Sequence, residues 1–138
     1  TKENRKPFVV VDYLQRLKSD ANDNLTAISE NIAMLKQLSI DFEIPVLVIT
    51  SYNRNGYLNG ANMSQGKGSG DIEYTCDCMI AAQMKGCGEE GFNQKMYDEL
   101  MEKDIRDLEL VFLKNRNWKV GIKTELSYIP AFNVMEEN

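Results

Sequence analysis

The hydrophobic pattern at the start of this chain has two periods, one typical of a strand and one typical of a helix. Residues 8–13 are apolar up to Asp12 and rich in valine, which predicts a strand buried on both faces at the centre of a parallel sheet. The next apolar residues recur at helical spacing, at Ile28, Ile32, Leu35, Leu38 and Phe42. With an N-cap expected among Asp23, Asn24 and Thr26, they predict an amphipathic helix of about four turns.

Pro45 ends this helix and introduces a second apolar run, residues 46–51, which predicts a second buried strand. The two strands and the helix between them form a βαβ unit. Residues 52–70 have no period and are rich in Asn, Gly and Ser. A loop of this length inside a compact domain is usually either functional or disordered.

The second half of the chain again alternates strand and helix patterns. The expected elements are a strand at residues 76–84, a turn at 86–91, a helix at 93–105, a strand at 108–114, a strand at 120–126 that forms a hairpin with it, and a further strand at 128–134. Met96, Leu100 and Met101 are expected to face inward from the helix. The pattern predicts an α/β fold with a mostly parallel sheet and antiparallel edge strands.

Length and charge narrow the class of protein. A chain of 138 residues with 43% apolar content is expected to form one domain with a real core. The net charge of −5 and the pI near 4.8 argue against a surface that binds nucleic acid as a whole, and leave room for a local basic patch. No apolar run approaches the roughly 20 residues of a membrane span and no signal peptide opens the chain, so a cytoplasmic protein without membrane contact is expected.

The cysteines give no sign of a disulfide framework or of a metal site. Cys76, Cys78 and Cys87 are odd in number, and the sequence has no histidine to complete a zinc site of the usual kind. We therefore expect reduced, structural thiols.

Two glycine-containing segments match phosphate-binding patterns only loosely. Residues 61–67 fit a relaxed phosphate loop, but Gly68 stands where Ser or Thr should coordinate Mg²⁺, and no strand leads directly into the segment. Residues 86–91 fit the dinucleotide pattern, but Glu89 and Glu90 would place two negative charges against a pyrophosphate. A turn before a helix, whose dipole favours these glutamates, is the better interpretation.

Two strand ends carry residue types suited to nucleotide chemistry. Asp12 ends the first strand, where a carboxylate holds Mg²⁺ in phosphate-binding α/β folds. Lys114 and Arg116 end the fourth strand and can present two cations to a polyphosphate. The simpler alternatives are a solvent-facing acid and solvated cations at strand ends.

One family has such motifs in the same order and at the same spacing over nearly the whole chain. The ATPase domain of DnaB-type bacterial and phage replicative helicases is similar in the segments Asp12-Tyr13-Leu14-Gln15, Thr50-Ser51-Tyr52-Asn53-Arg54, Gly68-Ser69-Gly70-Asp71-Ile72-Glu73 and Lys114-Asn115-Arg116-Asn117. The resemblance implies a RecA-like P-loop NTPase fold and a homo-hexameric ring. It also implies that ATP hydrolysis between neighbouring subunits drives movement along single-stranded DNA.

The resemblance also assigns roles to single residues. Asp12 corresponds to the Walker B acid, which holds Mg²⁺ through water, and Gln15 and Ser51 join it as residues of the ATP site. Lys114 and Arg116 correspond to the pair that reaches across a subunit interface to the γ-phosphate of a neighbour's ATP.

The stretch from residue 53 to residue 70 occupies the place of the family's DNA-contacting loops. It carries two cations and no acid, which is the right sign for a phosphate track, and a flexible surface loop would have a similar composition. The expected DNA-contacting residues are Arg54, Lys67, Gly68, Ser69 and Gly70.

Departures from the family's motifs indicate a divergent member. The family usually has Ser-Gln after the second strand, where this chain has Thr50-Ser51, so the long amide that relays nucleotide state to the DNA loops is shortened. The family's Gly-Pro after the second basic motif is replaced by Trp118-Lys119.

The family's phosphate loop and catalytic glutamate lie upstream of Asp12. We therefore expect residues 1–138 to be a single partial domain, the C-terminal half of a RecA-like helicase core truncated before the Walker B strand. The parent would be an ATP-dependent DNA helicase, with a primase or a helicase loader as further partners, and the fragment alone would be inactive. Two alternatives are another RecA-fold ATPase, such as a recombinase or clock-type paralogue, and a non-catalytic module that binds nucleic acid or protein.

Overall fold

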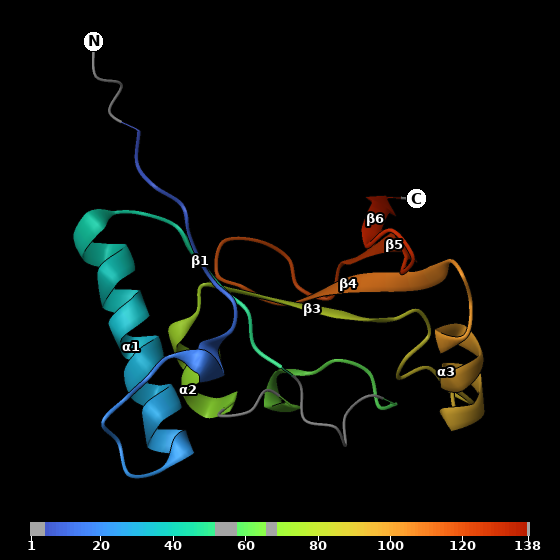
Figure 1. Ribbon diagram of the computed structural model, residues 1–138, viewed down its shortest axis with the longest axis horizontal. Coiled ribbons are helices and arrows are strands. Elements are labelled where there is room, and N and C mark those ends of the chain that lie inside the picture. The colour runs from blue at the N-terminus through green and yellow to red at the C-terminus, as the bar shows by residue number, and fades with distance from the viewer. Residues whose placement is uncertain (1–4, 52–57, 66–68, 138) are drawn as a thin grey trace. The chain divides into compact units, whose positions relative to one another are not determined.

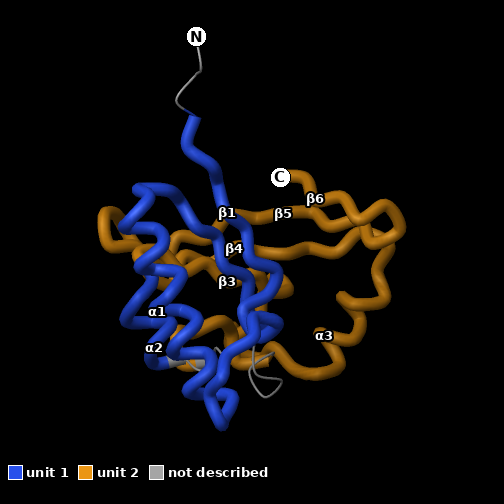
Figure 2. Tube along the Cα trace, turned by 60° about the vertical axis from the view of Figure 1, so that its left-hand side comes forward, with its two compact units in different colours: residues 1–51, 66–76 blue, residues 52–65, 77–138 orange. Residues whose placement is uncertain are grey.

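The computed structural model describes residues 5–51, 58–65 and 69–137, which form two compact units. Unit 1 contains residues 1–51 and 66–76, and unit 2 contains residues 52–65 and 77–138 (Figure 2). Figure 1 shows the helices and strands of the chain. Each unit is therefore built from two separate segments of the chain.

Unit 1 is a βαβ arrangement followed by a second helix. Strands β1 (Val9–Val11) and β2 (Val46–Val48) are parallel, with Val9 opposite Val46 and Val11 opposite Val48. Helix α1 (Asn24–Phe42) connects them, and helix α2 (Ser69–Thr75) packs against α1. The side chains of Ser29 and Asp71 are hydrogen-bonded between the two helices. A 3₁₀ turn, Leu14–Arg16, follows β1.

The beginning of α1 confirms the N-cap expected from the sequence. The Asp23 carboxylate accepts hydrogen bonds from the amides of Leu25 and Thr26, each at 2.9 Å, and from the Thr26 hydroxyl at 2.6 Å. These bonds satisfy donors that have no partner within the helix, and they lower the pKa of Asp23.

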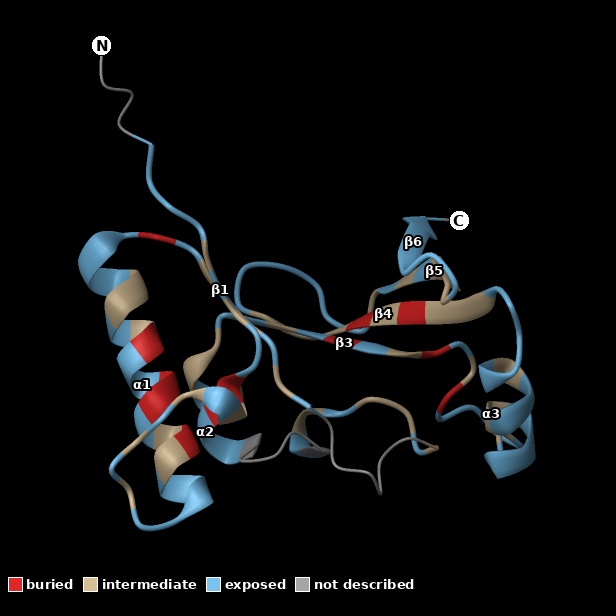
Figure 3. Cartoon of the chain, viewed as in Figure 1, coloured by how far each residue is buried: buried red, intermediate tan, exposed pale blue. Residues whose placement is uncertain are grey.

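The core of unit 1 lies where α1, the 3₁₀ turn and α2 meet. In Figure 3 the buried residues of α1 fall along one side of the helix. The buried apolar residues of the unit are Leu14, Ile28, Ile32, Leu35, Ile44 and Ile72. Three of the five apolar residues expected at the core face of α1 are thus confirmed as buried, and Leu38 is half-buried. The prediction is wrong for Phe42, which is 64% exposed on the last turn of the helix.

The expectation that the first strand is buried on both faces is wrong for the described residues. Val10 and Leu47 lie opposite each other in the parallel pair and are 52% and 48% exposed. β1 and β2 form a two-stranded sheet in the part of the chain that the structure describes, so no third strand extends it there.

Unit 2 contains an antiparallel meander of four strands. Its strands are β3 (Cys78–Met84), β4 (Arg106–Asn115), β5 (Lys123–Ile129) and β6 (Val134–Glu137), and they pair in that order. Helix α3 (Gln94–Met101) lies in the connection from β3 to β4. The unit also includes a 3₁₀ turn at Met63–Gln65.

The mostly parallel sheet expected from the sequence is not confirmed, because the pairings of β3 with β4, β4 with β5 and β5 with β6 are all antiparallel. The helical pattern between β3 and β4 resembles the crossover of a parallel pair, but antiparallel neighbours can be joined by a connection of any length. The antiparallel hairpin of β4 and β5 is confirmed. The last expected strand is shifted, since residues 130–133 form a turn and β6 begins at Val134.

Helix α3 differs from its expected packing. Asn93 caps it through a hydrogen bond from the Met96 amide, 3.2 Å long. None of its residues is buried, and Met96 and Met101 are 44% and 37% exposed. The core of unit 2 lies instead under β3 and β4, at Ala81, Met84, Cys87 and Val111.

Candidate functional site

Asp12 lies at the carboxyl end of the parallel strand pair. The chain continues from β1 alongside the end of β2, because the Ile49 amide donates to the Val11 carbonyl at 2.9 Å and the Leu14 amide donates to the Ile49 carbonyl at 2.8 Å. The Asp12 side chain is exposed at this edge. Ligands of open α/β sheets bind outside the carboxyl ends of parallel strands, so the position suits a phosphate or metal site.

Gln15 connects the two strand ends through its side chain. Its Nε2 donates to the Thr50 hydroxyl at 2.7 Å. Its Oε1 is buried and has no hydrogen-bond partner among the described residues. A buried amide oxygen without a donor costs free energy, so this oxygen suits a hydrogen bond from bound water or ligand. Ser51, one residue beyond Thr50, is exposed.

Lys114 and Arg116 lie at the end of β4, where the strand is irregular. Met79 pairs with Lys114 and Ile80 with Phe112, so Leu113 has no partner on β3. Such a bulge bends a strand and re-aims the side chains beyond it. Lys114 is half-buried, and Arg116 is exposed just past the strand.

One partner of Arg116 is Asp77. The Arg116 amide donates to the Asp77 carbonyl at 2.9 Å, and its Nη1 lies 3.4 Å from the Asp77 carboxylate. Both side chains are about half exposed, and an ion pair in such a solvated position contributes little to stability.

The sequence-predicted site residues fall into both units. Asp12, Gln15 and Ser51 lie at one edge of unit 1, whereas Lys114 and Arg116 belong to unit 2. Of the expected DNA-contacting residues, Arg54, Lys67 and Gly68 lie outside the described residues.

Ser69 and Gly70 form the first turn of α2, although the sequence interpretation extended the loop to Gly70. The helix has a single buried apolar residue, Ile72, so it has no helical period that the sequence could display. An added Cβ at Gly70 would meet no heavy atom within 4 Å.

Unit 2 also contains a polar cluster that the sequence interpretation missed, made of Gln83, Glu109 and Lys123. The Glu109 side chain is buried and accepts hydrogen bonds from Gln83 and from the Lys123 ammonium, the latter at 2.8 Å. This bond raises the pKa of Lys123. The sequence gives no clear signal for this cluster, because a glutamate between two leucines of a strand points to the face opposite to them, where solvent is expected.

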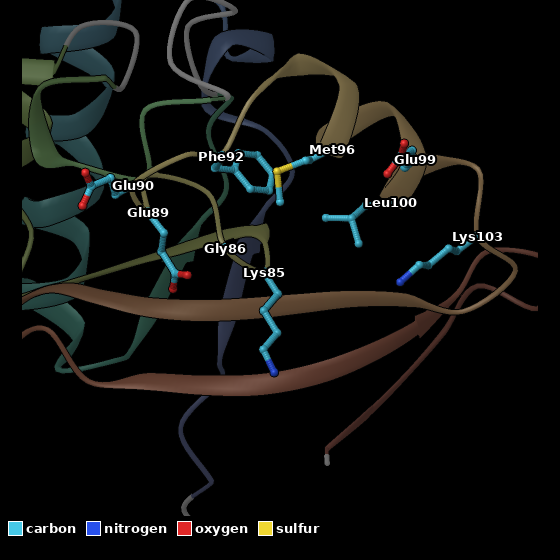
Figure 4. A pocket seen from close by; sticks show the side chains of 9 residues that line it. All are labelled: Lys85, Gly86, Glu89, Glu90, Phe92, Met96, Glu99, Leu100 and Lys103. Carbon is cyan, nitrogen blue, oxygen red and sulfur yellow. The ribbon is translucent and has the colours of Figure 1, made fainter.

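A hollow of about 290 Å³ lies beside α3 (Figure 4). Phe92, Met96 and Leu100 form its apolar side. The two lysines of its lining are paired, Lys85 with Glu125 at 2.8 Å and Lys103 with Asp107 at 3.8 Å. The hollow has neither a nucleophile nor a free cation among the described side chains, so it does not compete with the strand ends as a site.

Two negative findings apply to the described residues. They contain no group of three or more His, Cys, Asp or Glu side chains that could hold a metal ion among themselves. Of the helices in this part of the chain, none combines the length and apolar character needed to cross a membrane.

Comparisons with known proteins agree with the resemblance seen in the sequence. The family model described as the DnaB-like helicase C terminal domain matches residues 1–137. Among solved structures, a DnaB-like replicative helicase studied for its interactions with primase matches with a TM-score of 0.69 and 25% sequence identity. The match covers 89% of this chain and 29% of that helicase chain. No curated protein matches significantly.

Proposed function

Because the chain belongs to the DnaB-like helicase C-terminal domain family, which has a RecA-like α/β fold, we propose that it is part of the ATP-driven motor of a replicative DNA helicase. The chain spans 29% of the helicase chain that it matches, so the proposal concerns a longer protein. In that protein the motor is a homo-hexamer that moves along single-stranded DNA, and primase or a loader binds to it. The observation that carries the proposal is the match of the family model over residues 1–137.

We propose that the edge formed by Asp12, Gln15 and Ser51 faces Mg²⁺ and the phosphates of ATP. Mg²⁺ neutralises charge on the phosphates when bound, and it is usually held by one or two carboxylates together with phosphate oxygens and water. One exposed carboxylate and one buried amide oxygen without a donor fit such a hydrated ion. Asp12 would hold the hydrated ion through its carboxylate, and Oε1 of Gln15 would supply a further acceptor for its water.

Arg116 is proposed to act on the ATP of a neighbouring subunit, with Lys114 beside it. A guanidinium is always charged and presents a planar fork of donors to phosphate oxygens. Its exposed position just past β4 supports contact with an anion from another subunit. Negative charge develops on the transferred phosphate group in the transition state, and a guanidinium interacts with it more strongly there than in bound ATP. Arg116 should therefore affect turnover more than ATP binding.

The test uses the complete helicase with the substitution Arg116→Ala. ATP binding should stay within a few-fold of wild type, while ATP turnover should fall by roughly 10³ or more. A mixture with a phosphate-loop variant should recover part of the activity, because some interfaces then combine an intact nucleotide site with an intact Arg116. The measurements are nucleotide titration and steady-state ATP hydrolysis by the separate and mixed rings.

Two control variants separate this role from a structural one. Lys119→Ala removes an exposed cation of the same β4–β5 connection and should leave turnover near wild type. Asp77→Asn weakens the ion pair of Arg116 and should also preserve turnover. If Asp77→Asn lost turnover as severely as Arg116→Ala, and mixing restored nothing, Arg116 would be a structural residue of the strand end.

A further inference from the structure

The segment at residues 58–61 is attached to the turn that follows β3. The Ala61 amide donates to Oε1 of Gln83 at 2.5 Å, and the Gly88 amide donates to the Leu58 carbonyl at 3.1 Å. Gly60 and Gly88 allow this contact, because a Cβ on Gly88 would lie 2.8 Å from Cα of Gly60. Both glycines have positive φ, at 71° and 84°. The backbones of two segments far apart in the sequence are therefore in direct contact.

The Gln83 amide has only one orientation that satisfies these bonds. Its Nε2 donates to the Cys87 carbonyl at 3.1 Å and also to the Glu109 carboxylate. With both hydrogens of the amide nitrogen used, the oxygen must face Ala61, and a flipped amide would place donors against the Ala61 N–H. The orientation of Gln83 is thus set by the acceptors on its other side.

Glu109 and Lys123 keep that orientation in place. Glu109 is only 3% exposed, and the same carboxylate oxygen accepts from Gln83 and from Lys123. A buried carboxylate needs a cation and hydrogen-bond donors to stay ionised inside a protein. Lys123 supplies the cation and Gln83 a donor, so the three side chains hold one another.

We propose that Gln83 is a positioning residue for the single-stranded DNA loop, and that Glu109 and Lys123 fix Gln83 in the orientation that holds residues 58–61. This inference rests on the proposed function, since residues 58–61 lie within the stretch that the family resemblance predicts to contact DNA. A segment held at its middle before DNA arrives loses less conformational entropy on binding. The cluster acts on DNA affinity through the backbone at Ala61, without itself meeting a phosphate.

The test uses the complete helicase with Gln83→Met, which keeps the length of the side chain and removes its hydrogen bonds. Hydrogen exchange at the amides of residues 58–61 should become about tenfold faster, as expected for one lost hydrogen bond. Affinity for a fluorescent oligothymidylate should fall by about tenfold. The matched control is Gln94→Met on α3, where the glutamine is exposed and its side chain donates to Asp98 on its own helix. Both quantities should stay at wild-type values in this control.

Salt dependence separates positioning from direct contact with phosphate. A residue that pairs with a single-strand phosphate contributes about 0.7 to the slope of log affinity against log salt, and its loss flattens the slope. Gln83→Met should weaken binding at every salt concentration and leave the slope unchanged. A changed slope would mean that the variant altered the phosphate contacts themselves and would overturn the proposal.

A charge-matched pair of variants tests Glu109 and Lys123. Lys123→Met leaves the buried carboxylate without its cation and should accelerate exchange at residues 58–61 and weaken DNA binding as Gln83→Met does. Adding Glu109→Gln to this variant should restore slow hydrogen exchange and DNA affinity. The amide carbonyl introduced by the substitution can still accept a hydrogen bond from Gln83, and no buried charge remains. If Lys123 met a phosphate directly, the double variant would stay weak and its salt slope would stay flattened, which would overturn its assigned role.

Failure of this inference is distinguishable from failure of the proposed function. If the wild-type helicase binds single-stranded DNA and Gln83→Met changes neither affinity nor exchange, the positioning role is wrong and the proposed function stands. If the wild-type protein does not bind single-stranded DNA, the proposed function fails, and the positioning role fails with it.

Discussion

The three cysteine side chains differ in burial: Cys76 is half-buried, Cys78 is exposed and Cys87 is buried. Cys87 is buried, and its burial raises the pKa of the thiol, while Cys78 is exposed. The thiolate is the reactive form, so Cys87 should need a higher pH than an exposed thiol to react and should also be shielded from the reagent.

We predict that iodoacetamide at pH 8 modifies Cys78 at least about tenfold faster than Cys87 in the folded protein. The gap should narrow as the pH rises toward the raised pKa of Cys87 and should vanish in urea. Peptide mass spectrometry after timed alkylation measures both rates in one sample. Equal rates in the folded protein would show that Cys87 is accessible.

At the residue scale, the sequence predicts best what depends on near neighbours. The Asp23 cap was predictable because its partners, Leu25 and Thr26, follow it directly. The bond from Gln15 to Thr50 and the Glu109 cluster were not, because their partners come from distant segments that only the fold brings together. Family resemblance pointed to Asp12 and Arg116, and their roles stay predictions.

At the element scale, α1, β3, β4 and β5 were predictable from period, within a few residues at their ends. The pairing of β3 with β4 was not, since a pattern along one strand does not reveal the direction of its neighbour. The short helix α2 had no periodic signal. Burial was overestimated at Phe42 and on α3, because an apolar residue can also stand exposed on the surface of a protein.

The turn after β3 offers a matched pair of glycines for a stability test. Gly88 and Gly91 have φ of 84° and 87°, but an added Cβ meets Gly60 at 2.8 Å in the first case and nothing within 4 Å in the second. Gly91→Ala should cost about 1–2 kcal/mol for the left-handed backbone alone. Gly88→Ala should lower the free energy of unfolding further, because the segment at residue 60 must move.

Urea unfolding of the 138-residue chain, followed by circular dichroism, measures both effects. The difference between the two variants reports the close approach of the backbones. Equal losses of stability would show that the segment at residues 58–61 moves away from Gly88 at no cost.

At the scale of the whole molecule, the described residues give the proposed nucleotide site one carboxylate, Asp12, and no loop of backbone amides to hold the phosphates. The sequence has no Gly-x-x-x-x-Gly-Lys-Ser/Thr motif, and a single strand-end acid leaves Mg²⁺ and its water as well satisfied in bulk. We predict that the 138 residues alone bind Mg-ATP with a dissociation constant on the order of millimolar or weaker.

Isothermal titration calorimetry with Mg-ATP is the direct measurement. Asp12→Asn serves as the control and should give the same small heats as the wild-type chain. Micromolar binding that Asp12→Asn abolishes would contradict the prediction and would show that this chain holds a complete nucleotide site.

The division of each unit into two chain segments has a consequence for the order of folding. The strands from β3 to β6 pair with their neighbours in sequence, and contacts that are local in sequence form quickly. Unit 1 must bring β2 back to β1 across the whole of α1 and must then wait for α2, which follows a segment of unit 2. We expect the meander to reach its native pairing first, although the ribosome makes β1 and α1 earlier. The last part of this chain to be synthesised is thus the first to be finished.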